Sequence, residues 1–418
     1  MPDDGLTRRG CFVAAALVST VRATAASAAG TGIVRLSLNE NPFGPSALVR
    51  DAIFGQLRDI PRYVGEEAAA LKSQIAAKEG VSPEQIILGE ILDQLGLCLA
   101  LEGPVEGEFL YSEPGYTALV DAVAPGGGKA IGVPLNASLE NDLPGFEARM
   151  SSKTRALYLI NPHNPSGTVT ETETLKTFLR KTSRRITVIV DEAYLEFEPD
   201  FRQRSAIALV HEGADVIVFR TFTKIYGLAG LAIGYAVAPV KLATAFTRQG
   251  LGEPHGLNRF ALAAASASLR DRAYVFDVRD KVTAERLLWH RMLDAIGYRR
   301  SDSRGNFVFF DTRRPHEAFS AAMAAEGVEI ARAFPPLNTW ARVSIAEAKG
   351  FRARPRPTAP RSRSTGCGRR VRHRSRLRSS HALRVHARSS SLRRAARRCL
   401  ASRSRAGAAR PRATLPSR

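Results

Sequence analysis

Apolar residues in the first 250 positions fall into short continuous runs separated by amphipathic stretches. The runs are rich in valine, isoleucine and leucine, as in VIVF just before Arg220. Strand-like runs lie within residues 83–88, 109–119, 156–167, 186–197 and 216–219, and helical spacing covers 47–57, a stretch ending near 78, 91–101 and 171–181. Apolar strands alternating with helices are typical of a parallel-rich sheet covered on both faces. The pattern predicts an α/β fold with its site at the carboxyl ends of the strands.

The pattern changes after about residue 247. Residues 248–300 contain alanine-rich and charged stretches with helical spacing. Strand-like residues 305–312, a helical stretch over 315–326 and the runs 327–334 and 340–345 follow. A few strands with helices at this length predict a smaller α+β domain.

Charge separates a near-neutral body from a basic end. The formal net charge is +21, but residues 351–418 hold 22 arginines, no lysine and no acid. Subtracting them leaves 39 basic and 40 acidic residues in the rest of the chain. We therefore predict a signal at 1–29, an extended arm at 30–46, a large domain at 47–247, a small domain at 248–350 and a tail at 351–418.

We expect the tail to be disordered, because it has too few apolar residues to offset the entropy of ordering. One explanation is an arginine-rich arm for nucleic acid or another anionic surface. The other, which we favour, is that the tail has no evolved role. A run of arginine, serine, alanine and proline that begins abruptly is what a shifted reading frame in a GC-rich gene gives. We therefore do not expect nucleic acid as a partner of the body.

The first 29 residues follow the order of an export signal. Arg8 and Arg9 precede the apolar residues 11–21, and small residues follow near Ala28. This order predicts a twin-arginine-like signal and a periplasmic location. The alternative is an N-terminal extension on a cytoplasmic protein. The apolar run is too short to span a bilayer, so no membrane anchoring is expected.

The four cysteines do not indicate a zinc site or a disulfide framework. Cys11, Cys98, Cys367 and Cys399 include no pair at CxxC spacing. We expect no metal, and we expect the Cys98 thiol to pack in the core.

Candidate chemistry centres on Lys224, which follows an apolar strand and precedes a glycine-rich turn. A lysine at a sheet edge can lose its proton and attack a carbonyl to form a Schiff base. Taken alone, it could equally point into water. Two other strand ends supply Asn164 and Asp191, whose individual alternatives are a turn asparagine and a solvated acid. Their convergence at one edge of the sheet favours a shared site.

The spacing of these residues resembles the fold-type-I pyridoxal-phosphate aminotransferases. Asn164 precedes Asp191 by 27 residues, and Lys224 follows Asp191 by 33. With NENPFGPS upstream and RVSI downstream, the order is most similar to the histidinol-phosphate aminotransferase branch over about residues 33–346. The resemblance implies a large domain with a mostly parallel mixed sheet and a smaller α+β domain. It also implies pyridoxal 5'-phosphate as cofactor.

The resemblance implies a role for each matching residue. Lys224 would bind the cofactor and move a proton at the substrate, and Asp191 would pair with the ring nitrogen. The other cofactor contacts would be the ring-oxygen partners Asn164 and Tyr194, the stacking Tyr116, the phosphate ligands Thr221 and Thr223, the backbone near Glu90 and Ile91, and Tyr63 from the other subunit of a homodimer. The substrate contacts would be Arg342, which would grip a carboxylate, together with Arg332 and Asn39.

Three departures from the family pattern affect this expectation. Ala232 stands where the family usually has an arginine that neutralises the phosphate. This loss should weaken cofactor binding by roughly 1.5–3 kcal/mol if no other cation substitutes. Glu90 stands in the phosphate loop, where a carboxylate is unfavourable unless it points away. The arginine-rich tail replaces the helix that normally closes the small domain, which predicts a marginally stable small domain and reduced activity.

The expected reaction is amino transfer between an L-amino acid or histidinol phosphate and a 2-oxo acid such as 2-oxoglutarate. Two alternatives use the same fold: an aromatic amino acid aminotransferase and a pyridoxal-phosphate decarboxylase. A third belongs to a different class, an inactive relative whose arginine-rich tail binds nucleic acid.

Overall fold

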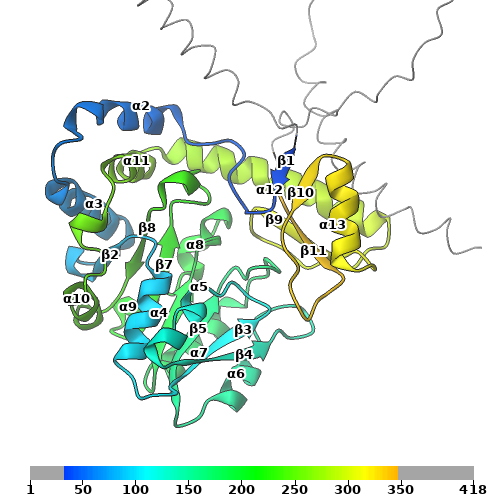
Figure 1. The fold of residues 1–418 in the computed structure, drawn as a ribbon, viewed down its shortest axis with the longest axis horizontal. Helices are drawn as coiled ribbons and strands as arrows, with labels where there is room; N and C mark the ends of the chain where they lie inside the picture. The colour runs from blue at the N-terminus through cyan, green and yellow to red at the C-terminus, as the bar shows by residue number, and fades with distance from the viewer. Residues whose placement is uncertain (1–32, 347–418) are drawn as a thin grey trace, which may run out of the picture.

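The computed structural model describes residues 33–346. The predicted signal and arginine-rich tail lie outside these residues. A seven-stranded sheet forms the centre of the large domain, with strand order β2-β8-β7-β6-β5-β3-β4 (Figure 1). Its strands are β2 (Ile86–Leu88), β3 (Glu108–Glu113), β4 (Lys129–Pro134), β5 (Thr154–Ile160), β6 (Thr187–Asp191), β7 (Val216–Thr221) and β8 (Gly234–Val237). Only β8 runs antiparallel to its neighbours β2 and β7, so the sheet is mixed and mostly parallel.

The two faces of the sheet carry separate apolar cores, as the alternation of side chains along a strand requires. In β7, Val216 and Val218 pack in one core, and Ile217 and Phe219 pack in the other. One face is covered by α4 (Leu92–Leu101), α5 (Ala118–Asp121) and α10 (Val240–Arg248). The other is covered by α3 (Gly65–Glu79), α6 (Leu143–Arg149), α7 (Thr172–Thr182) and α9 (Ile207–His211). The short helix α8 (Phe201–Arg204) follows β6.

The small domain combines two short strand pairs with helices. β9 (Phe307–Asp311) pairs antiparallel with β11 (Trp340–Ser344). β10 (Val328–Ile330) pairs parallel with β1 (Val34–Leu36). Helix α13 (His316–Ala325) packs on β10, and the long helix α12 (Arg272–Ala295) joins the two domains (Figure 1).

Two segments lie elsewhere than their sequence positions predict. The residues expected as an extended arm contribute β1 to the small domain, because the β1–β10 pairing is a long-range contact with no local signal. Helix α11 (Arg259–Arg270), expected in the small domain, packs against α2 (Ala47–Gly55) and α3. Within residues 33–346, no helix is both long and apolar enough to cross a bilayer.

Candidate active site

The carboxyl ends of β5, β6 and β7 open into one cavity of about 740 Å³. Its walls come from these strand ends, from the segment around Asn39 and from the small domain. The predicted residues that line it are Asn39, Glu90, Tyr116, Asn164, Asp191, Tyr194, Thr221, Thr223, Lys224, Arg332 and Arg342. The convergence follows from topology, because neighbouring parallel strands end at the same edge of a sheet.

Asp191, the last residue of β6, points its carboxylate into the cavity and is 3% exposed. It accepts hydrogen bonds from the Tyr158 hydroxyl at 3.0 Å and from the Ala193 backbone N–H at 2.9 Å. Burial raises the pKa of Asp191 to about 6, although both hydrogen bonds and the nearby Lys224 oppose the rise. The carboxylate is therefore held by two hydrogen bonds in a buried position where solvent does little to stabilise its charge, an arrangement that suits a cationic partner.

The Tyr194 hydroxyl is hydrogen-bonded to two asparagine side chains in the cavity. It accepts from the side-chain amide of Asn39 at 3.1 Å and from that of Asn164 at 3.4 Å. The Asn164 carbonyl in turn accepts from the Arg342 guanidinium. The chain of contacts connects both domains to one hydroxyl group.

Lys224 faces this group from the loop after β7. Its Nζ atom lies 5.8 Å from the centre of the Tyr194 ring. The loop turns at Gly227, where φ is +76° and an added Cβ would lie 2.6 Å from the Gly44 carbonyl oxygen. The glycine therefore lets the lysine loop pack directly on the segment after β1.

Arg342 is the cation best fixed in the small-domain wall. Its second terminal nitrogen donates to the Ser37 carbonyl at 2.7 Å, and its guanidinium lies 5.2 Å from the Phe334 ring centre. Burial lowers the pKa of Arg342 to about 10. Arg332 lines the same cavity and lies 4.7 Å from that ring. The wall thus presents two guanidinium groups to a ligand anion.

Two of the predicted residues do not line the cavity. Tyr63 is 89% exposed, and its ring lies perpendicular to the His255 ring at a centroid distance of 5.7 Å. Ile91 is buried in the core beside Gly89. Its backbone precedes α4, so only its main chain remains available for the predicted role.

A buried charged cluster supports β7 from the side away from the cavity, and the sequence analysis did not identify it. Arg220 is 1% exposed and pairs with Glu192 at 2.9 Å and Glu79 at 3.0 Å. Burial alone would raise the pKa of Glu79, but Arg220 and Lys78 lower it to about 2. The signal available in the sequence was a single arginine inside an apolar strand, which requires buried acidic partners.

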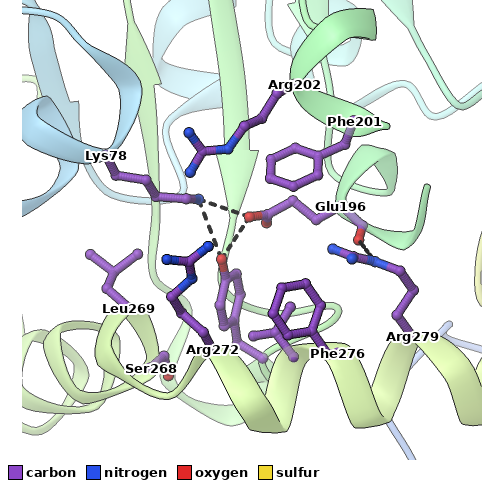
Figure 2. A pocket seen from close by; sticks show the side chains of 11 residues that line it. Lys78, Glu196, Phe201, Arg202, Ser268, Leu269, Arg272, Phe276 and Arg279 are labelled. Atoms are coloured by element: carbon purple, nitrogen blue, oxygen red, sulfur yellow. Dashed lines mark hydrogen bonds and ion pairs between the residues drawn. The ribbon is translucent and has the colours of Figure 1, made fainter. Parts of the chain in front are cut away.

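Figure 2 shows the edge of this cluster at a second cavity of about 250 Å³. Lys78 donates to Glu196 at 2.8 Å, and Tyr226 donates to the same carboxylate at 2.6 Å. Arg279 of α12 donates to the Glu196 carbonyl at 2.8 Å. The cluster therefore connects α3, the loop after β6 and helix α12. Through Tyr226 it also holds the loop that carries Lys224.

The arrangement matches a known family. The model of that family, described as aminotransferase class I and II, matches residues 31–350. The chain belongs to the class I and II aminotransferases. Histidinol-phosphate aminotransferase 2 of Pasteurella multocida is 33% identical over 302 residues, which cover 71% of this chain and 81% of the relative. Histidinol-phosphate aminotransferase of Limosilactobacillus fermentum is 30% identical over 322 residues, or 76% of this chain and 88% of the relative.

Solved structures agree with this assignment. A putative histidinol-phosphate aminotransferase from Erwinia carotovora atroseptica superposes with a TM-score of 0.72 at 29% identity, covering 76% of this chain and 93% of the other. Histidinol-phosphate aminotransferase from Sinorhizobium meliloti, solved in complex with pyridoxal-5'-phosphate, has a TM-score of 0.69 at 30% identity, covering 76% and 88%. The predicted fold and cofactor are confirmed. This aminotransferase depends on pyridoxal phosphate and has fold type I.

The donor set of the cavity fits the ring of this cofactor. Among residues 33–346, no cation lies at bonding distance from the buried Asp191 carboxylate, and a protonated ring nitrogen would supply one. Tyr194 and Asn164 offer hydrogen bonds on the β5 side for the ring oxygen. Tyr116 lies at the mouth, 46% exposed, where burial raises the pKa of its hydroxyl to about 12. The aminotransferase can therefore hold the ring by its nitrogen, its oxygen and the Lys224 amine.

Proposed function

We propose that this aminotransferase moves an amino group between histidinol phosphate or an L-amino acid and a 2-oxo acid such as 2-oxoglutarate. The observation that carries the proposal is the pair Arg342 and Arg332 facing the same cavity as Lys224. A phosphate on the donor or a carboxylate on the acceptor is the anion that such a pair recognises. The names of the relatives support histidinol phosphate as the first donor to test.

The chain's own residues divide the work of the reaction. The Lys224 amine would hold the cofactor and would move the proton of the substrate Cα. When bound, the cofactor supplies an electron-withdrawing ring that stabilises negative charge on that carbon. Asp191 would keep the ring nitrogen protonated, and Tyr194 and Asn164 would hold the ring oxygen. Arg342 orients the substrate so that its Cα–H faces Lys224.

A donor panel tests this function. Purified enzyme is given 2-oxoglutarate with histidinol phosphate, phenylalanine, tyrosine or histidine, and glutamate formation is measured. We expect the highest kcat/KM with histidinol phosphate. A preference for the aromatic amino acids would assign the chain to aromatic amino acid transfer instead. Release of CO₂ without glutamate would show a decarboxylase and contradict the proposal.

We propose that the enzyme acts as a homodimer in which Tyr63 serves the partner's site. Tyr63 is 89% exposed and lies outside the cavity of its own chain, which supports this role. Lys224→Ala and Tyr63→Ala chains, each inactive alone, are mixed and refolded together. Recovery of about a quarter of the activity, from hybrids holding one intact site, is expected at random pairing. No recovery in verified hybrids would contradict the shared site.

We propose export to the periplasm from the pattern of Arg8, Arg9 and the apolar residues 11–21 alone. Cell fractionation of the full chain and of an Arg8→Lys, Arg9→Lys variant tests this. Periplasmic protein that becomes cytoplasmic in the variant is expected. Equal cytoplasmic amounts of both would contradict export.

A further inference from the structure

The end of the cavity next to β7 carries a carboxyl group. Glu90 lies in the loop between β2 and α4, and its carboxyl group is in hydrogen-bond contact with the Thr221 hydroxyl. Thr221 also contacts the Thr223 hydroxyl at 2.8 Å. Gly234 leaves room for this carboxyl, since an added Cβ would lie 3.1 Å from Glu90 Oε1. Glu90 therefore points into the cavity. An acid in a phosphate-binding loop would be expected to point away, because its negative charge repels the phosphate.

The order of the strands shows that this end faces the phosphate. On the cofactor ring, the carbon that bears the aldehyde lies between the carbon with the ring oxygen and the carbon with the phosphate arm. β6, which carries Asp191, lies between β5 and β7 in the sheet. Asn164 and Tyr194 hold the ring oxygen on the β5 side, so the phosphate arm reaches the β7 side. The side chains that line the cavity on that side are those of Thr221, Thr223 and Glu90.

No spare cation of the described chain faces this end. The cations lining the cavity in residues 33–346 are Lys224, Arg332 and Arg342. Lys224 is assigned to the bond with the cofactor. Arg342 is bound to Asn164 on the opposite side, and Arg332 lies against the same Phe334 ring as Arg342 in the small-domain wall. Arg220 directly precedes Thr221 in β7, but its side chain is directed away from the cavity, into Glu79 and Glu192. Ala232, with φ +44°, lines the cavity with a methyl group only.

We propose that Glu90 contacts the cofactor phosphate as an uncharged carboxylic acid, so that this enzyme takes up a proton when it binds its cofactor and binds it more weakly as the pH rises. An ionised Glu90 would repel the phosphate in a partly buried site where no cation separates them. A neutral carboxyl instead donates its O–H to a phosphate oxygen. The proposal rests on the cofactor assignment made above.

The surroundings of Glu90 favour its neutral form. Burial raises its pKa, and Asp191 of β6 and Asp93 of α4 raise it further. The Thr221 hydrogen bond and the Lys224 charge oppose the rise. The Tyr116 hydroxyl also faces Glu90 and stays protonated, because burial raises its pKa to about 12. A phosphate adds a further negative charge, so the carboxyl of the bound state holds its proton to a higher pH than that of the free enzyme.

The sign of the pH effect follows from proton linkage. Above the pKa of Glu90 in the free enzyme, each binding event must take up one proton, and affinity falls by up to ~tenfold per pH unit. Any other group that takes up or releases a proton on binding is present in both wild type and the Glu90 variant. A comparison of variants therefore isolates the contribution of Glu90.

The test titrates cofactor-free enzyme with pyridoxal phosphate between pH 6 and 9, following the visible absorbance of the bound cofactor. Wild type, Glu90→Gln and Ala232→Arg are compared, and pyridoxal without phosphate serves as the second ligand. We expect Glu90→Gln to match wild type at low pH and to bind pyridoxal phosphate at least ~tenfold tighter at high pH. We expect Ala232→Arg to tighten binding of pyridoxal phosphate but not of pyridoxal.

Calorimetry in two buffers of different ionisation enthalpy counts the protons taken up. Glu90→Gln should take up about one proton fewer per bound cofactor than wild type at pH 8. A constant affinity ratio between wild type and Glu90→Gln across the pH range, with equal proton counts, would overturn the role of Glu90. Such a result with an intact visible band leaves the aminotransferase assignment in place, whereas absence of the band in every variant contradicts both.

Discussion

The side-chain amide of Asn39 donates to the hydroxyl of Tyr194 at 3.1 Å, across 155 positions of the chain. Asn39 is fully buried and has a φ of +55°. Its backbone N–H donates to the Ser344 hydroxyl at 2.9 Å, and its carbonyl accepts from Asn306 at 2.9 Å. One residue therefore fixes the segment after β1 both to the small domain and to the ring-oxygen side of the active site.

Asn39→Ala should reduce both activity and stability. The change removes one hydrogen-bond partner of the Tyr194 hydroxyl. It also places alanine at a positive φ, a backbone conformation that asparagine tolerates better than alanine does. Together these cost about 1–3 kcal/mol of the free energy of unfolding, measured by denaturant titration. Asn39→Gly is the matched control, because it removes the side chain and relieves the backbone. If glycine and alanine lower kcat equally, the side chain acts through Tyr194; wild-type kcat in the glycine variant would contradict that role.

The Arg220 cluster should contribute more to stability than a surface ion pair of the same kind. Arg220→Met leaves Glu79 and Glu192 buried without their cation, and we expect a loss of about 3–5 kcal/mol in the free energy of unfolding. Arg180→Met is the control, because Arg180 pairs with Glu212 at 2.7 Å on the surface with 41% of its side chain exposed. The control should lose about 0–1 kcal/mol. Equal losses would show that the buried cluster is not a support of β7.

Asp191 makes the stability of the cofactor-free enzyme depend on pH. Its pKa is raised from 3.8 to about 6 in the folded protein. The folded state therefore holds a proton that the unfolded state has lost, and stability falls as the pH rises from about 4 to 6, by up to about 3 kcal/mol. Urea titrations of wild type and Asp191→Asn measure this. The stability of the variant relative to wild type should rise through this window; a difference that does not change with pH would contradict the burial of the charge.

Arg342 should act on the substrate carboxylate. Arg342→Lys keeps a charge but loses the two-pronged contact, so KM for 2-oxoglutarate should rise about ten- to a hundredfold while the cofactor band is retained. Arg299→Lys is the control, because Arg299 lies outside the cavity and packs 5.5 Å from the Trp340 ring centre. An unchanged KM in Arg342→Lys would remove this arginine from the substrate site.

The convergence of Asn164, Asp191 and Lys224 could be predicted from the sequence, because the carboxyl ends of neighbouring parallel strands lie at the same edge of a sheet. The alternation of side chains, which continues one residue past the end of β6, also explains why Asp191 faces the cavity and Glu192 faces Arg220. The sequence did not predict β8, because its first residues read as part of the glycine-rich turn. It did not predict the β1–β10 pair either, since that pairing depends on residues about 290 positions apart, such as Ser37 and Glu329 at 2.6 Å.

The direction in which a side chain points also had to come from the structure. The sequence left open whether Glu90 faces the cavity, and only the contact with Thr221 decides it. The exposure of Tyr63 and the burial of Ile91 likewise could not be predicted from the sequence, because both depend on how the loops around α3 and α4 pack.

The covalent bond between Lys224 and the cofactor is the most direct test of the account. The purified enzyme is loaded with pyridoxal phosphate, reduced with borohydride, digested and analysed by mass spectrometry. The account predicts the reduced cofactor on the peptide that contains Lys224, and its loss in Lys224→Ala. A label on a different lysine of the loaded enzyme would contradict it.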